Sequence, residues 1–262
     1  MGIRNLGILD NYYSGHIASS RLTDRVICFR VAGENPDVDT ASIEDVWETG
    51  GVYSYLENAA FLTLVSTSAS DAPTLGGLES VTLTGIDENY DYQIATYTLN
   101  GVTGVVTTEK WLRVFSFRGE VNNPASADYN TKAQGLITAK DATVTQAAIL
   151  AGNTASKQSF ITVLNGYTGF LENAYTSGGA ADDFIMRFAT RKNDGIFISG
   201  SDIEVTNSSF ASVVFDPPTE AITEKTDIKV EAQAQVQNAQ VRIAYAVTMI
   251  RNDYLQSLAE SM

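Results

Sequence analysis

The stretch IKVEAQAQVQNAQVRIAYAVTM, residues 228–249, decides the fold class of this chain. Apolar and polar residues alternate on each side of Asn238. A period of two is typical of a β-strand that turns one face to a core and the other to solvent. The pattern therefore predicts two antiparallel strands, residues 228–237 and 241–249, which pair as the closing hairpin of a β domain.

The same alternation recurs along most of the chain and predicts an all-β protein. Asn100-Gly101 predicts a tight hairpin, because both central residues of a type I′ turn need positive φ. Residues 147–150 predict an exposed bend or a helical turn, and the spacing of Tyr254 and Leu258 predicts a short terminal helix or a docking tail. Further strands are predicted at residues 26–31, 61–66, 80–85, 93–99, 111–117, 136–139, 160–164, 168–176, 183–190, 195–199 and 210–215.

Short strands that follow one another at intervals of about 8–12 residues favour two β-sandwich or jelly-roll-like domains, preceded by an irregular N-terminal arm. In the arm, Glu34-Asn35-Pro36-Asp37 predicts a turn. Because the arm has little apolar content, we expect it to dock on a neighbour or on a partner subunit. The expected divisions are an arm at 1–40, a first domain at 41–140, a linker at 141–157, a jelly-roll-like domain at 158–250 and a tail at 251–262.

The composition excludes several classes of partner. The formal net charge is −14 and the 17 Lys and Arg residues form no basic stripe, which argues against nucleic acid and against anionic membranes. A hydrophobic content of 44% is enough for a real core. The first fifteen residues hold no apolar run of signal-peptide length, so we expect synthesis in a cytoplasm without export by a cleaved signal.

Few residues suggest catalysis, and none is assigned as a catalytic or cofactor-binding site. Cys28 is the only cysteine, so no disulfide forms within the chain, and its apolar neighbours favour a small buried hydrophobe over a reactive thiol. His16 is the only histidine, and it lies in the arm, away from any nucleophile motif. We expect a protein that is not an enzyme and that needs no cofactor.

One acidic segment begins like a calcium loop. Asp87, Asn89 and Asp91 alternate as Asp-x-Asn-x-Asp, but Tyr92 stands where the loop needs Gly and Thr98 where it needs Glu. A solvated hairpin tip is the favoured interpretation, and a bound cation is the alternative. Paired carboxylates for glycoside hydrolysis stay open, because only the structure gives their separation.

Aromatic and small residues suggest two further roles. For Trp47, Trp111 and the Tyr side chains, the favoured interpretation is packing in a core or between subunits. The alternative is that they line a face that binds sugars. Small residues on the closing strands permit close packing between subunits. These residues are Ala232, Ala234, Gln235, Ala244 and Ala246.

The landmarks of residues 30–250, read in order, resemble a group of tailed-bacteriophage virion proteins that is common in marine phages. The resemblance implies an all-β virion structural protein of two domains, with a jelly-roll-like C-terminal half and homotrimeric assembly. The resemblance does not distinguish a capsid decoration, a head fibre and a tail-associated component. The matching elements are Asn35–Thr40, Glu44–Trp47, Gly50-Gly51, Tyr53–Leu56, Leu99–Gly101, Trp111–Val114, Asn165–Leu171, Phe215–Pro218 and Glu224–Ile228.

Three hypotheses follow from these observations. The first is a virion-located capsid decoration (cement) or head-fibre protein that binds the major capsid protein or other virion proteins, with residues 2–31 as docking arm. The second is a fibre, knob or adaptor of the tail that helps host attachment. The third is a module that binds or cleaves carbohydrate, with a host surface glycan as partner.

Overall fold

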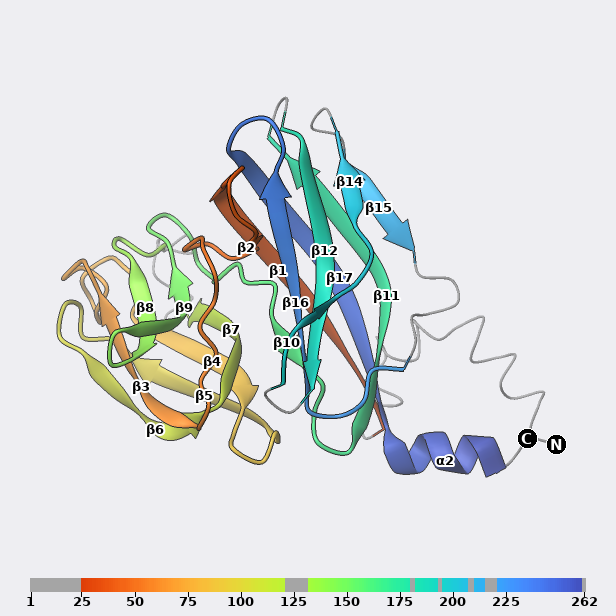
Figure 1. Ribbon diagram of the computed structural model, residues 1–262. Coiled ribbons are helices and arrows are strands. Elements are labelled where there is room, and N and C mark those ends of the chain that lie inside the picture. Colours follow the sequence, from red (N-terminus) through yellow and green to blue (C-terminus); the bar gives the residue numbers. More distant parts are fainter. Residues whose placement is uncertain are drawn as a thin grey trace.

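The computed structural model describes residues 25–120, 132–179, 182–192, 195–206, 210–214 and 221–260. This part of the chain is built from antiparallel strands and one short helix (Figure 1), which confirms the all-β class. No helix among the described residues is long and apolar enough to cross a membrane.

The described elements are seventeen strands and one helix. The helix α2 (Asn252–Glu260) comes last. The strands are β1 (Val26–Val38), β2 (Glu44–Asp45), β3 (Ala60–Ser66), β4 (Ser80–Ile86), β5 (Tyr92–Thr98), β6 (Val105–Trp111), β7 (Arg113–Glu120), β8 (Ile137–Asp141), β9 (Val144–Ile149), β10 (Ile161–Thr162), β11 (Tyr167–Gly178), β12 (Phe184–Lys192), β13 (Ile198–Ser199), β14 (Ile203–Val205), β15 (Ala211–Val214), β16 (Thr226–Ala234) and β17 (Ala239–Arg251).

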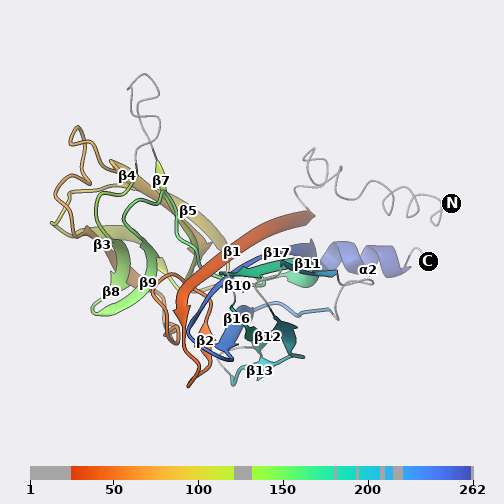
Figure 2. The same cartoon turned by 90° about the horizontal axis from the view of Figure 1, so that it is seen from above.

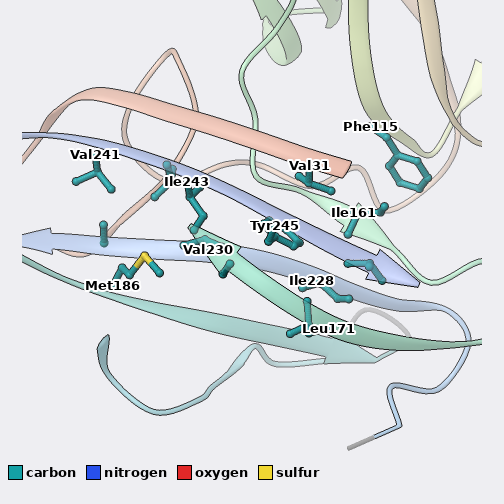
Figure 3. Close-up of a cluster of buried hydrophobic side chains, with 14 of the residues drawn as sticks. Val31, Phe115, Ile161, Leu171, Met186, Ile228, Val230, Val241, Ile243 and Tyr245 are labelled. Atoms are coloured by element: carbon teal, nitrogen blue, oxygen red, sulfur yellow. The ribbon is translucent and has the colours of Figure 1, made fainter. Parts of the chain in front are cut away.

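Two facing sheets form what we call the large body. Sheet A has the order β1-β17-β11-β15, and sheet B has the order β10-β16-β12-β13, with β14 beside β12 and β2 beside β16. Figure 3 shows side chains of sheet A, such as Ile243 and Tyr245, pointing toward Val230 and Met186 of sheet B. Burial of these alternating faces against each other is the main hydrophobic contribution to this body.

The small body contains strands β3 to β9 and has its own hydrophobic cluster. Its sheets have the orders β6-β3-β8-β9 and β5-β4-β7. Figures 1 and 2 show this body beside the large one. The two bodies meet where Leu112 and Phe115 of the small body enter the core of the large body. The cluster of the small body includes Leu62, Leu64, Val81, Leu83, Trp111, Phe117, Ile137 and Ile149.

The closing strands exist, but the prediction that they pair as a hairpin is wrong. β16 pairs with β12, β10 and β2 in sheet B, whereas β17 pairs with β1 and β11 in sheet A. Alternation fixes which face of a strand is buried and does not fix its neighbour. The turn at Asn238 therefore carries the chain from one layer to the other, and both apolar faces enter the same core.

Strand β1 extends through the turn predicted at residues 34–37, so that prediction is wrong. β1 pairs with β17 from Val26 to Asn35, and after an irregularity Val38 pairs with Ala239. Gly33 makes the close packing of β1 feasible, because a Cβ there would lie 2.6 Å from the carbonyl oxygen of Val46. Residues 26–38 of the expected arm are thus an edge strand of sheet A.

Two other predictions fail in the small body, and one of its strands is not predicted. Residues 147–150, expected as a bend, are mostly the end of β9, and Ala147 is fully buried. β6 is not predicted, because its apolar residues are Val105, Val106 and Trp111, which do not alternate along the strand. Asn100-Gly101 joins β5 to β6, which lie in different sheets, so the expected two-residue hairpin does not form. Gly101 does adopt the predicted positive φ, at 57°.

Candidate functional site

The most highly organised polar site lies between the two bodies and centres on Arg113 and Asp227. Arg113 opens β7 of the small body, and Asp227 lies near the start of β16 in sheet B. Arg113 Nε lies 3.1 Å from Asp227 Oδ1, and Nη2 lies 3.0 Å from Oδ2. Both side chains are only 3% exposed. This bidentate ion pair therefore ties the bodies together across 114 residues of sequence.

Asp227 collects further donors from the large body. Arg191 of β12 donates through Nε at 3.2 Å and Nη2 at 2.6 Å, and Thr162 of β10 donates its hydroxyl at 2.6 Å. The buried carboxylate is thereby surrounded by hydrogen-bond donors, which is the condition under which a buried charge is tolerated. Burial by itself would lower the pKa of Arg113, but the charge of Asp227 outweighs this and raises that pKa above its ordinary value.

Cations and aromatic rings alternate beside this ion pair, in an arrangement that we call the cation ladder. The guanidinium carbon of Arg113 lies 4.9 Å from the centre of the Tyr55 ring, and that of Arg191 lies 4.4 Å from the same ring. Arg191 is also 4.7 Å from the Phe197 ring, and Lys229 Nζ is 4.4 Å from it. The ladder thus holds the segment that carries Tyr55 against both bodies.

Lys229 ends the ladder and is itself paired. Its Nζ lies 2.7 Å from Asp45 Oδ1 and 2.8 Å from Glu231 Oε1. Asp45 also accepts the backbone N–H of Tyr53 at 2.7 Å. Burial raises the pKa of Asp45, and the nearby Lys229 offsets part of that effect. Lys229 falls at a polar position of the alternation in β16, yet it is only 5% exposed, because Phe197 and the segment before Leu56 cover it.

A groove of about 650 Å³ runs over the ladder, lined by residues 52–58 together with Arg191, Phe197 and Lys229. The ladder cations lie over the rings of Tyr55 and Phe197, and carboxylates hold those cations. The ring faces in the groove are therefore already covered by cations, and those cations are already paired with carboxylates. Such an arrangement favours a structural role over the binding of a ligand.

A second buried carboxyl group, Glu48, lies close to the crossing between the bodies. Its side chain is 5% exposed, the N–H of Lys157 donates to Oε2, and Oε1 has no hydrogen-bond partner among the described residues. Burial raises the pKa of Glu48 to about 8, and the Lys157 amide offsets only part of this. Burial therefore favours the protonated form of the Glu48 carboxyl group in the folded protein.

The acidic residues that resemble a calcium loop lie at the hairpin tip between β4 and β5. Asp87 Oδ1 accepts the N–H groups of Asn89 at 2.8 Å and Asp91 at 3.0 Å. These hydrogen bonds are those of an Asx-type turn. The described residues contain no group of three or more His, Cys, Asp or Glu that is arranged to hold a metal ion.

The two tryptophans predicted to line a sugar-binding face are buried. Trp111 is fully buried in the small body, and Trp47 is 6% exposed. The ring of Trp47 packs at 5.1 Å from Tyr53 and at 6.0 Å from Phe160. Neither indole can stack on a sugar ring without unfolding its surroundings, so this part of the carbohydrate hypothesis is wrong.

The remaining sequence candidates separate into core and surface. Ala232 and Ala234 are 2% exposed and belong to the core of the large body, so they pack within the chain and not between subunits. Ala244 and Ala246 instead lie on the outer face of sheet A, where Cys28 is half-buried and burial raises the pKa of its thiol. His16 and residues 1–24 of the arm lie outside the described residues.

Sequence reasoning missed Arg113, Arg191 and Asp227. Arg113 and Asp227 stand beside apolar strand residues, and Arg191 stands between Thr190 and Lys192. Nothing in these local patterns distinguishes a buried charge from a solvated one. The pairing of residues 114 positions apart depends on tertiary structure alone.

Comparisons with known proteins give little that bears on this site. No protein-family model and no curated protein sequence matches the chain. Among solved structures, one of infectious bursal disease virus, Gt strain, is 9% identical, with 87% of this chain and 73% of that chain covered and a TM-score of 0.21. The VP2 subviral particle of the same virus is 11% identical, with the same coverage and a TM-score of 0.20. At such TM-scores the likeness supports no argument about fold or function.

Proposed function

We propose that this chain is a structural protein of a bacteriophage particle and that it has no catalytic activity. The observation that carries the proposal is where the landmarks of the resemblance meet in space. Asp45, Tyr55, Arg113 and Asp227 come from four separate matching elements, and all four belong to the ion pairs and cation ladder of the junction. The elements that resemble virion proteins thus build a rigid joint.

A rigid joint of this kind suits a particle component. The junction fixes the small body on the large one with a doubly hydrogen-bonded, 3% exposed ion pair, and buried pairs of this kind favour one relative arrangement of their partners. A shell protein needs fixed geometry, because each copy must present the same contacts to its neighbours. The charge of −14 keeps the free protein soluble before assembly.

In finer detail, we propose a decoration or head-fibre protein that binds the major capsid protein or other virion proteins and assembles as a homotrimer. Its two bodies would correspond to the two sandwich or jelly-roll-like domains that the resemblance implies. The N-terminal arm would dock on the shell. No nucleic acid and no membrane takes part in this proposal.

Quantitative mass spectrometry of purified particles tests the proposal. The ratio of this chain to the major capsid protein is measured with isotope-labelled peptides of both. We expect at least one copy per several capsid subunits. A handful of copies per particle would instead make it a fibre, knob or adaptor of the tail, and absence from the particles would contradict the virion role altogether.

A further inference from the structure

The outer face of sheet A is a surface that the described residues of the chain leave open. The register of its strands aligns Ala32 of β1 with Ala244 of β17 and Tyr175 of β11, and aligns Arg30 with Ala246. Small side chains in the middle of the face make a groove of about 730 Å³, and a second hollow of about 430 Å³ shares Ala32, Tyr175 and Ala244 with it. The floor is thus low and continuous along β1 and β17.

An aromatic ridge stands beside the groove. Tyr175 of β11 and Phe210, next to β15, stack with ring centres 5.7 Å apart and an interplanar angle of 23°. Tyr175 is 43% exposed and Phe210 is 66% exposed. A stacked pair of rings that keeps this much apolar surface in water is typical of an anchor that fills a pocket on a partner.

The face also carries charges of both signs. Arg30 is exposed at the edge of the groove, and the described residues provide it with no ion pair. Glu172 lies on the same face and accepts a hydrogen bond from the hydroxyl of Thr248. Arg30 lies on β1 and Glu172 on β11, on the two sides of β17. A neighbouring copy that lays its β11 along this β1 therefore brings an acid to the arginine, and the charges on the two sides of the face are complementary.

We propose that this face is where copies of the chain associate, with the Tyr175–Phe210 ridge of one copy in the alanine groove of another. The alanines let the partner's rings approach the backbone of the sheet, and the ridge supplies the apolar area that the groove lacks. The inference names the surface of the oligomer in the proposed function, and its test uses purified protein without particles.

The oligomer mass, measured by light scattering after size exclusion, tests the surface. We expect the wild-type chain to elute at a multiple of its monomer mass and Ala244→Arg to elute as a monomer, because the long charged side chain fills the groove. Thr98→Arg, on an exposed strand position of the small body, is the matched control and keeps the wild-type mass. We expect Tyr175→Ser, which removes the ridge, to lower the association constant at least tenfold. This variant provides the test if Ala244→Arg folds poorly.

Cys28 provides an independent readout, because it is the only cysteine and it lines the groove. We expect a maleimide to label Cys28 at least tenfold more slowly at high protein concentration than after dilution, and to label Ala244→Arg at one rate throughout. The control carries Cys28→Ser and Thr98→Cys, and its rate is independent of concentration.

A monomeric wild-type chain, or an oligomer that survives both Ala244→Arg and Tyr175→Ser, would overturn the inference. An oligomer that depends on this face in a chain that particles lack would overturn the virion role and leave the inference intact.

Discussion

Asp227→Asn is the sharpest test of the junction, because it removes one charge and keeps the shape of the side chain. Asp227 pairs with Arg113 across the bodies and with Arg191 within sheet B. The substitution leaves both guanidinium groups buried without their counter-ion, and an amide accepts hydrogen bonds through only one oxygen. Breaking a buried ion pair on one side costs about 3–5 kcal/mol of unfolding free energy.

The expected loss is measured by urea unfolding followed by circular dichroism. With a slope of about 3 kcal/mol per molar urea, the midpoint falls by about 1–1.7 M. Asp253→Asn is the matched control, because Asp253 also pairs bidentately with an arginine but lies on the surface. That variant should unfold at the wild-type midpoint. A loss below about 1 kcal/mol for Asp227→Asn would refute the claim that this pair holds the bodies together.

Three further substitutions test other buried features of the fold. Glu48→Gln should remove a pH dependence of the unfolding free energy. The Glu48 carboxyl group has a pKa of about 8 in the folded protein and 4.5 in the unfolded chain, so the wild-type protein loses stability as pH rises between these values. The loss is on the order of 3 kcal/mol from pH 5 to pH 8, so wild type and variant should differ most at pH 8 in thermal unfolding at both pH values. Asp71→Asn should cost about 1–3 kcal/mol in urea titration, because both of its oxygens accept backbone N–H groups, from Leu78, Gln134 and Gly135. Gly85→Ala should lower the melting temperature strongly, because its Cβ would lie 2.0 Å from the carbonyl oxygen of Arg113.

Each of these three has an outcome that contradicts its reasoning. A stability difference between Glu48→Gln and wild type that stays constant with pH would mean that Glu48 is charged in the folded state. An Asp71→Asn variant as stable as wild type would mean that solvent reaches those amides. A Gly85→Ala variant with an unchanged melting temperature would mean that the β4–β7 pair opens freely.

The sequence predicted the strands far better than their pairing. Alternation located β16 and β17 closely, since each has one apolar face and that face is buried. Their partners depend on which sheet each face closes, and this is a property of the whole core. The hairpin prediction failed for that reason.

The candidate site was less accessible to sequence reasoning than the fold. Lys229 alternates with apolar neighbours as a solvated residue would, and only the packing of Phe197 over it makes it buried. The tryptophans gave the opposite error, because an aromatic residue has the same local pattern in a core as on a binding face. The landmarks around Asp45 and Asp227 did mark the junction, although not its chemistry.

The proposed role as a fixed structural part of a phage particle is tested most directly by a cryo-electron-microscopy map of purified particles that resolves strands. We predict density that fits the large and small bodies joined as in Figure 1, repeated with the symmetry of its station, with the outer face of sheet A against another copy. A map of intact particles that contains no such density would contradict the account.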